Sequence, residues 1–114
     1  MNTVVSIGNA EQYPWGNGCD GWHLVQRADL SVIQERVPPG KSERKHYHKR
    51  SRQFLYVLDG TAAMEIDERI VTLKPRDEVE IPPGVLHRLR NESNQDLDFL
   101  VVSAPKSHGD RVDL

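Results

Sequence analysis

Turn-forming residues recur about every ten residues along this chain and limit it to short elements. The 114 residues include seven Pro and eight Gly, which interrupt regular backbone hydrogen bonding or favour turns. No ten-residue window combines a 3.6-residue apolar period with freedom from Gly and Pro, so we expect no long amphipathic helix. Asp59-Gly60 between two apolar runs is a strong hairpin signal. Short apolar runs between turns are typical of an all-β sandwich or barrel. The expected strands cover residues 30–37, 54–58, 61–66, 70–73, 78–81, 86–90 and 97–103.

Length and composition predict one small domain. A chain of 114 residues falls within the range of about 100–150 residues that is most common for a single domain. With 37% hydrophobic and 28% charged residues, it has the composition of an ordinary globular protein. We expect an N-terminal arm over residues 1–25 that packs on the barrel or on a partner. The barrel follows over residues 26–105, and a C-terminal tail over residues 106–114.

Several classes of protein are disfavoured by composition. No stretch approaches the roughly 18 consecutive apolar residues of a membrane helix, and the first residues do not form a secretory signal. Cys19 is the single cysteine, which excludes an internal disulfide and a cysteine metal cluster. A formal net charge of −2 gives no general attraction for nucleic acid. We therefore expect a cytoplasmic protein without nucleic-acid or membrane partners, whose chemistry depends on a few residues.

Two of the five histidines stand two residues apart, at His46 and His48. Side chains alternate along a β-strand, so both imidazoles would share one face. Two ring nitrogens on one face can bind one metal ion at about 2.0–2.2 Å. The pair also fits a solvated basic loop, because half of residues 41–52 are Lys or Arg. Such a stretch is either a positive rim that attracts anions or, more simply, a solvated surface. His23 and His108 are expected at the surface.

The residues around this pair resemble the two sequence motifs of the cupin superfamily. The first motif reads G-x5-H-x-H-x3-4-E-x6-G, and the second reads G-x5-P-x-G-x2-H-x3-N. The first corresponds to Gly40, His46, His48, Gln53 and Gly60. The second corresponds to Arg76, Pro82, Gly84, His87 and Asn91. Two positions depart from the pattern, since Arg76 replaces a Gly and Gln53 replaces the Glu.

This resemblance implies a double-stranded β-helix, a jelly-roll-like barrel, that holds one divalent metal ion. Carried over by position, the ligands would be His46, His48, Gln53 and His87. Nitrogen and oxygen donors do not distinguish Fe, Mn, Ni, Zn and Cu. Because Gln53 is neutral, the site would keep a net charge of +2 and favour an anionic ligand such as a carboxylate, an enolate or a catecholate. The same replacement removes a carboxylate that could act as a base.

Strand alternation predicts the lining of the barrel from these ligand positions. Glu35 is a lone acid on the more apolar face of its strand, where it would serve as a base or as a partner for a ligating His, or else lie in solvent at the strand end. The outward-facing Phe54, Tyr56 and Leu58 need cover from a partner's sheet or from the N-terminal arm, and we expect a homodimer. The residues expected to line a substrate cavity are Leu55, Val57, Leu89, Phe99 and Val101.

Three functions remain open from the sequence. The first is a mononuclear metal-dependent oxygenase or isomerase that acts on a small anionic molecule. The second is a non-catalytic cupin that binds or senses a small ligand. The third is a metal-free structural cupin. The fold alone does not choose among them, because one fold carries many chemistries.

Overall fold

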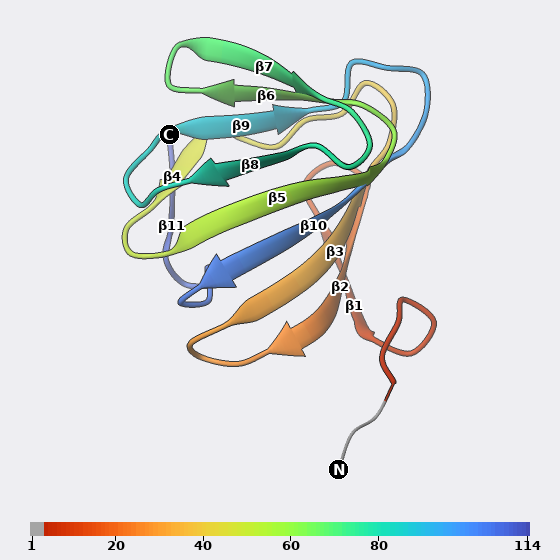
Figure 1. Cartoon of the computed structure of the whole chain (residues 1–114), viewed down its shortest axis with the longest axis vertical. Coiled ribbons are helices and arrows are strands. Elements are labelled where there is room, and N and C mark those ends of the chain that lie inside the picture. Colours follow the sequence, from red (N-terminus) through yellow and green to blue (C-terminus); the bar gives the residue numbers. More distant parts are fainter. Residues whose placement is uncertain (1–3) are drawn as a thin grey trace.

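The computed structural model describes residues 4–114, which form eleven β-strands in two antiparallel sheets (Figure 1). No helix occurs among these residues. The all-β double-stranded β-helix predicted from the sequence is confirmed. The strands are β1 (Glu11–Trp15), β2 (Cys19–Gln26), β3 (Ser31–Val37), β4 (His46–His48), β5 (Arg52–Asp59), β6 (Ala62–Ile66), β7 (Arg69–Leu73), β8 (Glu78–Ile81), β9 (His87–Arg90), β10 (Leu97–Ala104) and β11 (Arg111–Asp113).

The six-stranded sheet has the order β1-β2-β3-β10-β5-β8, and the five-stranded sheet has the order β11-β4-β9-β6-β7. The long central strands β5 and β10 bury every second side chain over most of their length, as expected for a sheet with one face on a core. In β10, Leu97, Phe99, Val101 and Ser103 are buried, while the residues between them are partly exposed. The predicted alternation of buried and exposed side chains is therefore present in these two strands.

The hydrophobic core lies where the inner faces of the two sheets meet. Its members from the six-stranded sheet include Val37, Val57 and Phe99, and those from the other sheet include Met64 and Leu89. All five side chains are at most 2% exposed. Close packing of this kind makes the positions of the inward-facing side chains rigid.

Both chain ends take part in the sheets. Residues 1–25, expected as an arm, contain β1 and most of β2, which extend the six-stranded sheet beyond β3; residues 1–3 lie outside the described residues. Residues 106–114, expected as a tail, contain β11, which pairs with β4. A membrane-crossing helix is absent from residues 4–114. Phe54 and Leu58 are each 38% exposed, and the homodimer stays a prediction.

Candidate metal and ligand site

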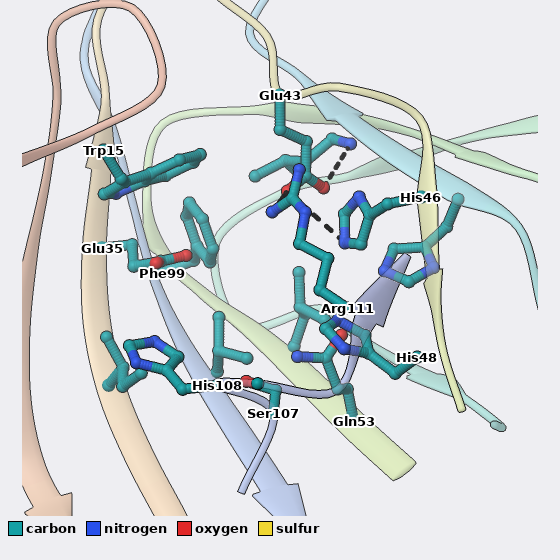
Figure 2. A pocket seen from close by; sticks show the side chains of 16 residues that line it. Trp15, Glu35, Glu43, His46, His48, Gln53, Phe99, Ser107, His108 and Arg111 are labelled. Atoms are coloured by element: carbon teal, nitrogen blue, oxygen red, sulfur yellow. Dashed lines mark hydrogen bonds and ion pairs between the residues drawn. The ribbon is translucent and has the colours of Figure 1, made fainter. Parts of the chain in front are cut away.

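A cavity of about 400 Å³ opens between the two sheets, with walls from both of them (Figure 2). This volume falls in the range of small-molecule sites, about 300–1,000 Å³. Its lining residues are Trp15, Ile33, Glu35, Glu43, His46, His48, Gln53, Leu55, His87, Leu89, Phe99, Val101, Ser107, His108, Gly109 and Arg111.

Three histidines converge on one wall of the cavity. His46 and His48 face inward from β4, as strand alternation predicts, and His87 lies directly opposite His46 on β9. All three are at most 6% exposed. One nitrogen from each ring lies within 4.8 Å of the corresponding nitrogens of the other two. His87 is 39 residues away from His48 in the sequence. The two side chains meet because β4 and β9 are neighbours in the five-stranded sheet.

Hydrogen bonds set the tautomers of two of these rings. Nδ1 of His46 lies 2.7 Å from the carbonyl oxygen of Arg44, and Nδ1 of His87 lies 2.9 Å from that of Val85. A carbonyl oxygen only accepts, so each Nδ1 carries the proton and each Nε2 keeps a lone pair. Burial lowers the pKa of His46 to about 3 and that of His48 to about 4, and it lowers the pKa of His87 as well. The three imidazoles are therefore neutral at pH 7, which is the form that binds metal.

The donors of this wall fit a divalent metal ion. Within the described chain, Nδ1 of His48 is buried without a hydrogen-bond partner, which is costly unless a group from outside the protein supplies an interaction. Gln53 is also buried, and its Nε2 donates to Oγ of Ser103 at 3.1 Å. This bond leaves the amide oxygen of Gln53 as the atom available to an ion or a ligand. Three imidazoles and one amide oxygen suit a divalent transition-metal ion and do not distinguish Fe, Mn, Ni, Zn and Cu.

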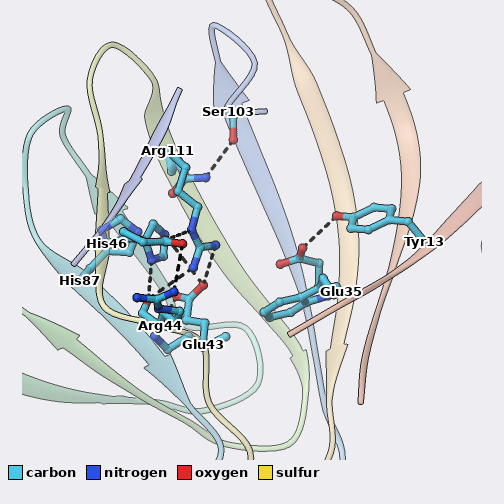
Figure 3. Close-up of polar contacts among 12 residues, drawn as sticks. Tyr13, Glu35, Glu43, Arg44, His46, His87, Ser103 and Arg111 are labelled. Atoms are coloured by element: carbon cyan, nitrogen blue, oxygen red, sulfur yellow. Dashed lines mark hydrogen bonds and ion pairs between the residues drawn. The ribbon is translucent and has the colours of Figure 1, made fainter. Parts of the chain in front are cut away.

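Glu43 places a carboxyl group beside the histidines (Figure 3). Its Oε2 accepts from the backbone N–H of Leu89 at 2.9 Å, and its Oε1 lies 3.9 Å from Nε2 of His46. Burial raises the pKa of Glu43 to about 8. The group is thus mostly protonated at pH 7, and His46 is neutral, so their contact is not an ion pair at that pH.

The C-terminal segment closes one side of the cavity. Arg111 on β11 forms an ion pair with Asp113 at 2.6 Å, and its Nη1 lies 3.8 Å from Oε1 of Glu43. Ser107 and His108 line the same side. Sequence reasoning missed Glu43, His108 and Arg111 as cavity residues. The one local signal for Arg111 was the alternation Arg-Val-Asp near the C-terminus.

Glu35 lines the cavity from β3, and Tyr13 of β1 donates a hydrogen bond to it (Figure 3). Burial raises the pKa of Glu35 to about 7. The hydrogen bonds of His46 and His87 go to backbone carbonyls, so Glu35 is not the partner that orients them. Of the residues expected to line a substrate cavity, the structure brings together Leu55, Leu89, Phe99 and Val101. Val57 faces inward as well, but it lies fully buried in the core and does not reach the cavity.

The structure is a double-stranded β-helix with a cavity, and three buried histidines on the cavity wall could hold a metal ion. The chain belongs to the cupin family, because residues 33–103 match the model of the Cupin domain. An uncharacterized protein of Methanocaldococcus jannaschii is 33% identical over 89 residues, which make up 77% of this chain and 71% of that protein.

Solved structures agree with this assignment. An RmlC-like cupin from Shewanella frigidimarina superposes with a TM-score of 0.84, with 20% identity and 96% of each chain covered. The polyketide cyclase RemF from Streptomyces resistomycificus superposes with a TM-score of 0.80 and 21% identity, covering 93% of this chain and 81% of that one. At these identities the likeness establishes the fold alone.

Proposed function

We propose that the protein binds one divalent metal ion through His46, His48 and His87, with Gln53 as a further ligand, and isomerises a small anionic molecule beside it. The observation that carries this proposal is the convergence of three buried, neutral imidazoles on one wall of the cavity. A solvated basic loop, the alternative for His46 and His48, does not bury both rings.

Charge supports an anionic ligand. The triad and Gln53 are neutral, so the protein ligands leave the charge of a divalent ion uncompensated. Glu43, the carboxyl group nearest to the triad, lies 3.8 Å from Nη1 of Arg111. The guanidinium of Arg111 therefore offsets the negative charge of Glu43 when this group is ionised, and the charge of the metal ion is left for the ligand. A carboxylate or phosphate is therefore the group that best matches this end of the cavity.

The second wall of the cavity supports an isomerase over an oxygenase. A metal ion bound at the triad would act as a Lewis acid that polarises an oxygen of the ligand. Isomerisation next to such an oxygen also needs a group that takes up and returns a proton. Glu35 faces the cavity and is suited to that role, whereas the oxygenase has no comparable observation in its favour. Leu55, Leu89, Phe99 and Val101 supply the apolar wall around the carbon skeleton.

Metal analysis of the purified protein tests the site. We expect about one divalent ion per chain in the wild type by inductively coupled plasma mass spectrometry, and less than a tenth of that in His87→Ala. His23→Ala, which removes a histidine outside the triad, serves as the control and should keep the ion. Equal metal content in His87→Ala and the wild type would show that the ligand assignment is wrong.

Turnover tests the reaction class. The metal-loaded protein should interconvert isomers of phosphorylated or carboxylated sugars, followed by ¹H NMR. It should not consume oxygen in the presence of catechols, diketones or thiols. Oxygen consumption by the Fe(II)-loaded protein would favour the oxygenase, and metal binding without either activity would favour a non-catalytic binding protein.

A further inference from the structure

Glu35 lines the cavity from the third of three adjacent strands, β1, β2 and β3. Tyr13 on β1 stands opposite Gly21 on β2, and Gly21 stands opposite Glu35 on β3. The three residues therefore form one row across the sheet. Figure 2 shows Glu35 beside Phe99, on the side of the cavity away from His46 and His48.

Gly21 has no side chain, which allows the side chain of Tyr13 to extend over β2 and reach Glu35. A Cβ at position 21 would lie 2.6 Å from the hydroxyl oxygen of Tyr13 and 2.7 Å from its Cε1, which is closer than real Cβ contacts permit. With glycine there, the ring lies over the backbone of β2, and its hydroxyl donates to Oε2 of Glu35 at 2.9 Å. Glycine is needed here for close approach of a side chain.

Aromatic neighbours hold the phenol in this position. The ring of His23 lies 4.7 Å from that of Tyr13, centroid to centroid, and the ring of His108 lies 5.7 Å away, edge to face. Such pairs stabilise a ring beyond simple burial. Tyr13 is thus packed on one side and hydrogen-bonded to Glu35 at its tip.

The hydrogen bond from Tyr13 occupies one oxygen of the Glu35 carboxyl group. Oε2 accepts from Tyr13, and no hydrogen bond to Oε1 occurs among residues 4–114. Because Glu35 lines the cavity, Oε1 is the oxygen available to a bound molecule. A carboxyl group with one oxygen held and one oxygen free is oriented for proton transfer.

We propose that Glu35 moves a proton on the molecule bound at the metal site, and that Tyr13, reaching across Gly21, is the residue that positions it. This inference rests on the proposed function. As a carboxylate, Glu35 takes a proton from the carbon next to a carbonyl group. The C–H electron pair becomes the C=C bond of an enolate, and the negative charge moves to the carbonyl oxygen. The Glu35 carboxylic acid then returns the proton to a carbon of the enolate.

The surroundings of Glu35 keep both of its protonation states accessible. Burial raises its pKa to about 7, while the hydrogen bond from Tyr13 and the charge of Arg111 on β11 lower it. Cys19 on β2 and Glu43 before β4 are near enough for the charge of Glu35 to act on them, and burial raises the pKa of both groups.

Hydrogen exchange on a probe tests the proton transfer directly. The probes are pyruvate and dihydroxyacetone phosphate, two enolisable anions, incubated in D₂O with the metal-loaded full chain and followed by ¹H NMR. We expect exchange above the buffer rate in the wild type and a loss of at least about 100-fold in Glu35→Gln. The exposed strand residue Glu78 provides the matched control, and Glu78→Gln should exchange like the wild type. Equal rates in Glu35→Gln and the wild type, or no exchange of either probe by the wild type, would overturn the proposal.

A titration without metal tests the positioning by Tyr13. The side-chain carboxyl carbon of Glu35, followed by ¹³C NMR in the metal-free protein, should titrate with a midpoint near 7. Tyr13→Phe and Gly21→Ala should each raise this midpoint, because both remove the hydrogen bond to the ionised form. An unchanged midpoint in Tyr13→Phe, which keeps the ring and the fold, contradicts the positioning role.

Metal content separates this inference from the proposed function. Glu35→Gln should bind as much metal as the wild type, since Glu35 is not a ligand. A wild type without metal refutes the proposed function even if Glu35 titrates as expected. A metal-loaded wild type whose exchange is unaffected by Glu35→Gln refutes only the role of Glu35.

Discussion

Metal binding at the histidine triad should change little between pH 7 and pH 5, unlike binding to exposed histidines. A proton competes with a metal ion for each ring nitrogen, so affinity falls as the neutral fraction of each imidazole falls. Burial removes this competition by keeping the free rings neutral. The pKa of His46 is lowered to about 3 and that of His48 to about 4.

The size of the effect follows from these values. An imidazole with the ordinary pKa of about 6.5 loses a factor of roughly 25 in its neutral fraction between pH 7 and pH 5. Two such rings would cost roughly 600-fold in affinity. With the lowered pKa values, His46 and His48 together lose only about 1.1-fold. The pKa of His87 is also lowered, so its loss stays below the roughly 25-fold of an ordinary imidazole, and we expect a total loss below about 30-fold.

Isothermal titration calorimetry with Co²⁺ at pH 7, 6 and 5 measures this dependence. A peptide of residues 44–50 carries His46 and His48 without burial and serves as the control, which should show the steep loss. Circular dichroism at each pH verifies that the protein stays folded. A loss of 100-fold or more in the folded protein would refute the reasoning that burial holds the free rings neutral.

Three further predictions concern stability and affinity. Because folding raises the pKa of Glu35 from 4.5 to about 7, the stability that this group contributes is present below pH 4.5 and lost as the pH rises to 7. Urea unfolding should therefore show Glu35→Gln gaining roughly 3 kcal/mol relative to the wild type over that window. Gln53→Glu should tighten metal binding by at least about tenfold, measured by calorimetry, because a carboxylate adds a negative ligand. Asn91→Ala should cost about 2–4 kcal/mol in urea unfolding, because its buried amide bonds the carbonyls of Val37 and Gln95; the exposed Asn94→Ala should cost less than about 0.5 kcal/mol.

Local sequence patterns were sufficient to predict the central strands and the residues that face inward from them. Gly60 and Pro82 marked the ends of β5 and β8, and a period of two placed Leu55 and Leu89 on the cavity side. The same period misled at Val57, which shares the inner face of β5 with Leu55 but lies past the end of the cavity. Alternation predicts which face of a strand a side chain lies on. It does not predict how far along the strand the cavity extends.

The second wall of the site depends on contacts between segments that are far apart in the chain. Tyr13 reaches Glu35 because β1, β2 and β3 are neighbours in one sheet, and because Gly21 leaves room for the ring. Arg111 reaches the cavity because β11 pairs with β4. Neither pairing has a signature within a short stretch of sequence, since hydrogen bonds between distant strands are selected by the packing of the whole barrel.

By itself, the sequence determined the β-class of the chain, the cupin motifs and the histidines suited to hold a metal ion. These features depend on turn chemistry, a two-residue period and fixed spacings, all of which are local. Only the tertiary structure decided which charged groups share the cavity with the triad and in which protonation state. Burial and neighbouring groups determine that state, and for Glu35, Glu43 and Arg111 both come from strands and loops that only folding brings together.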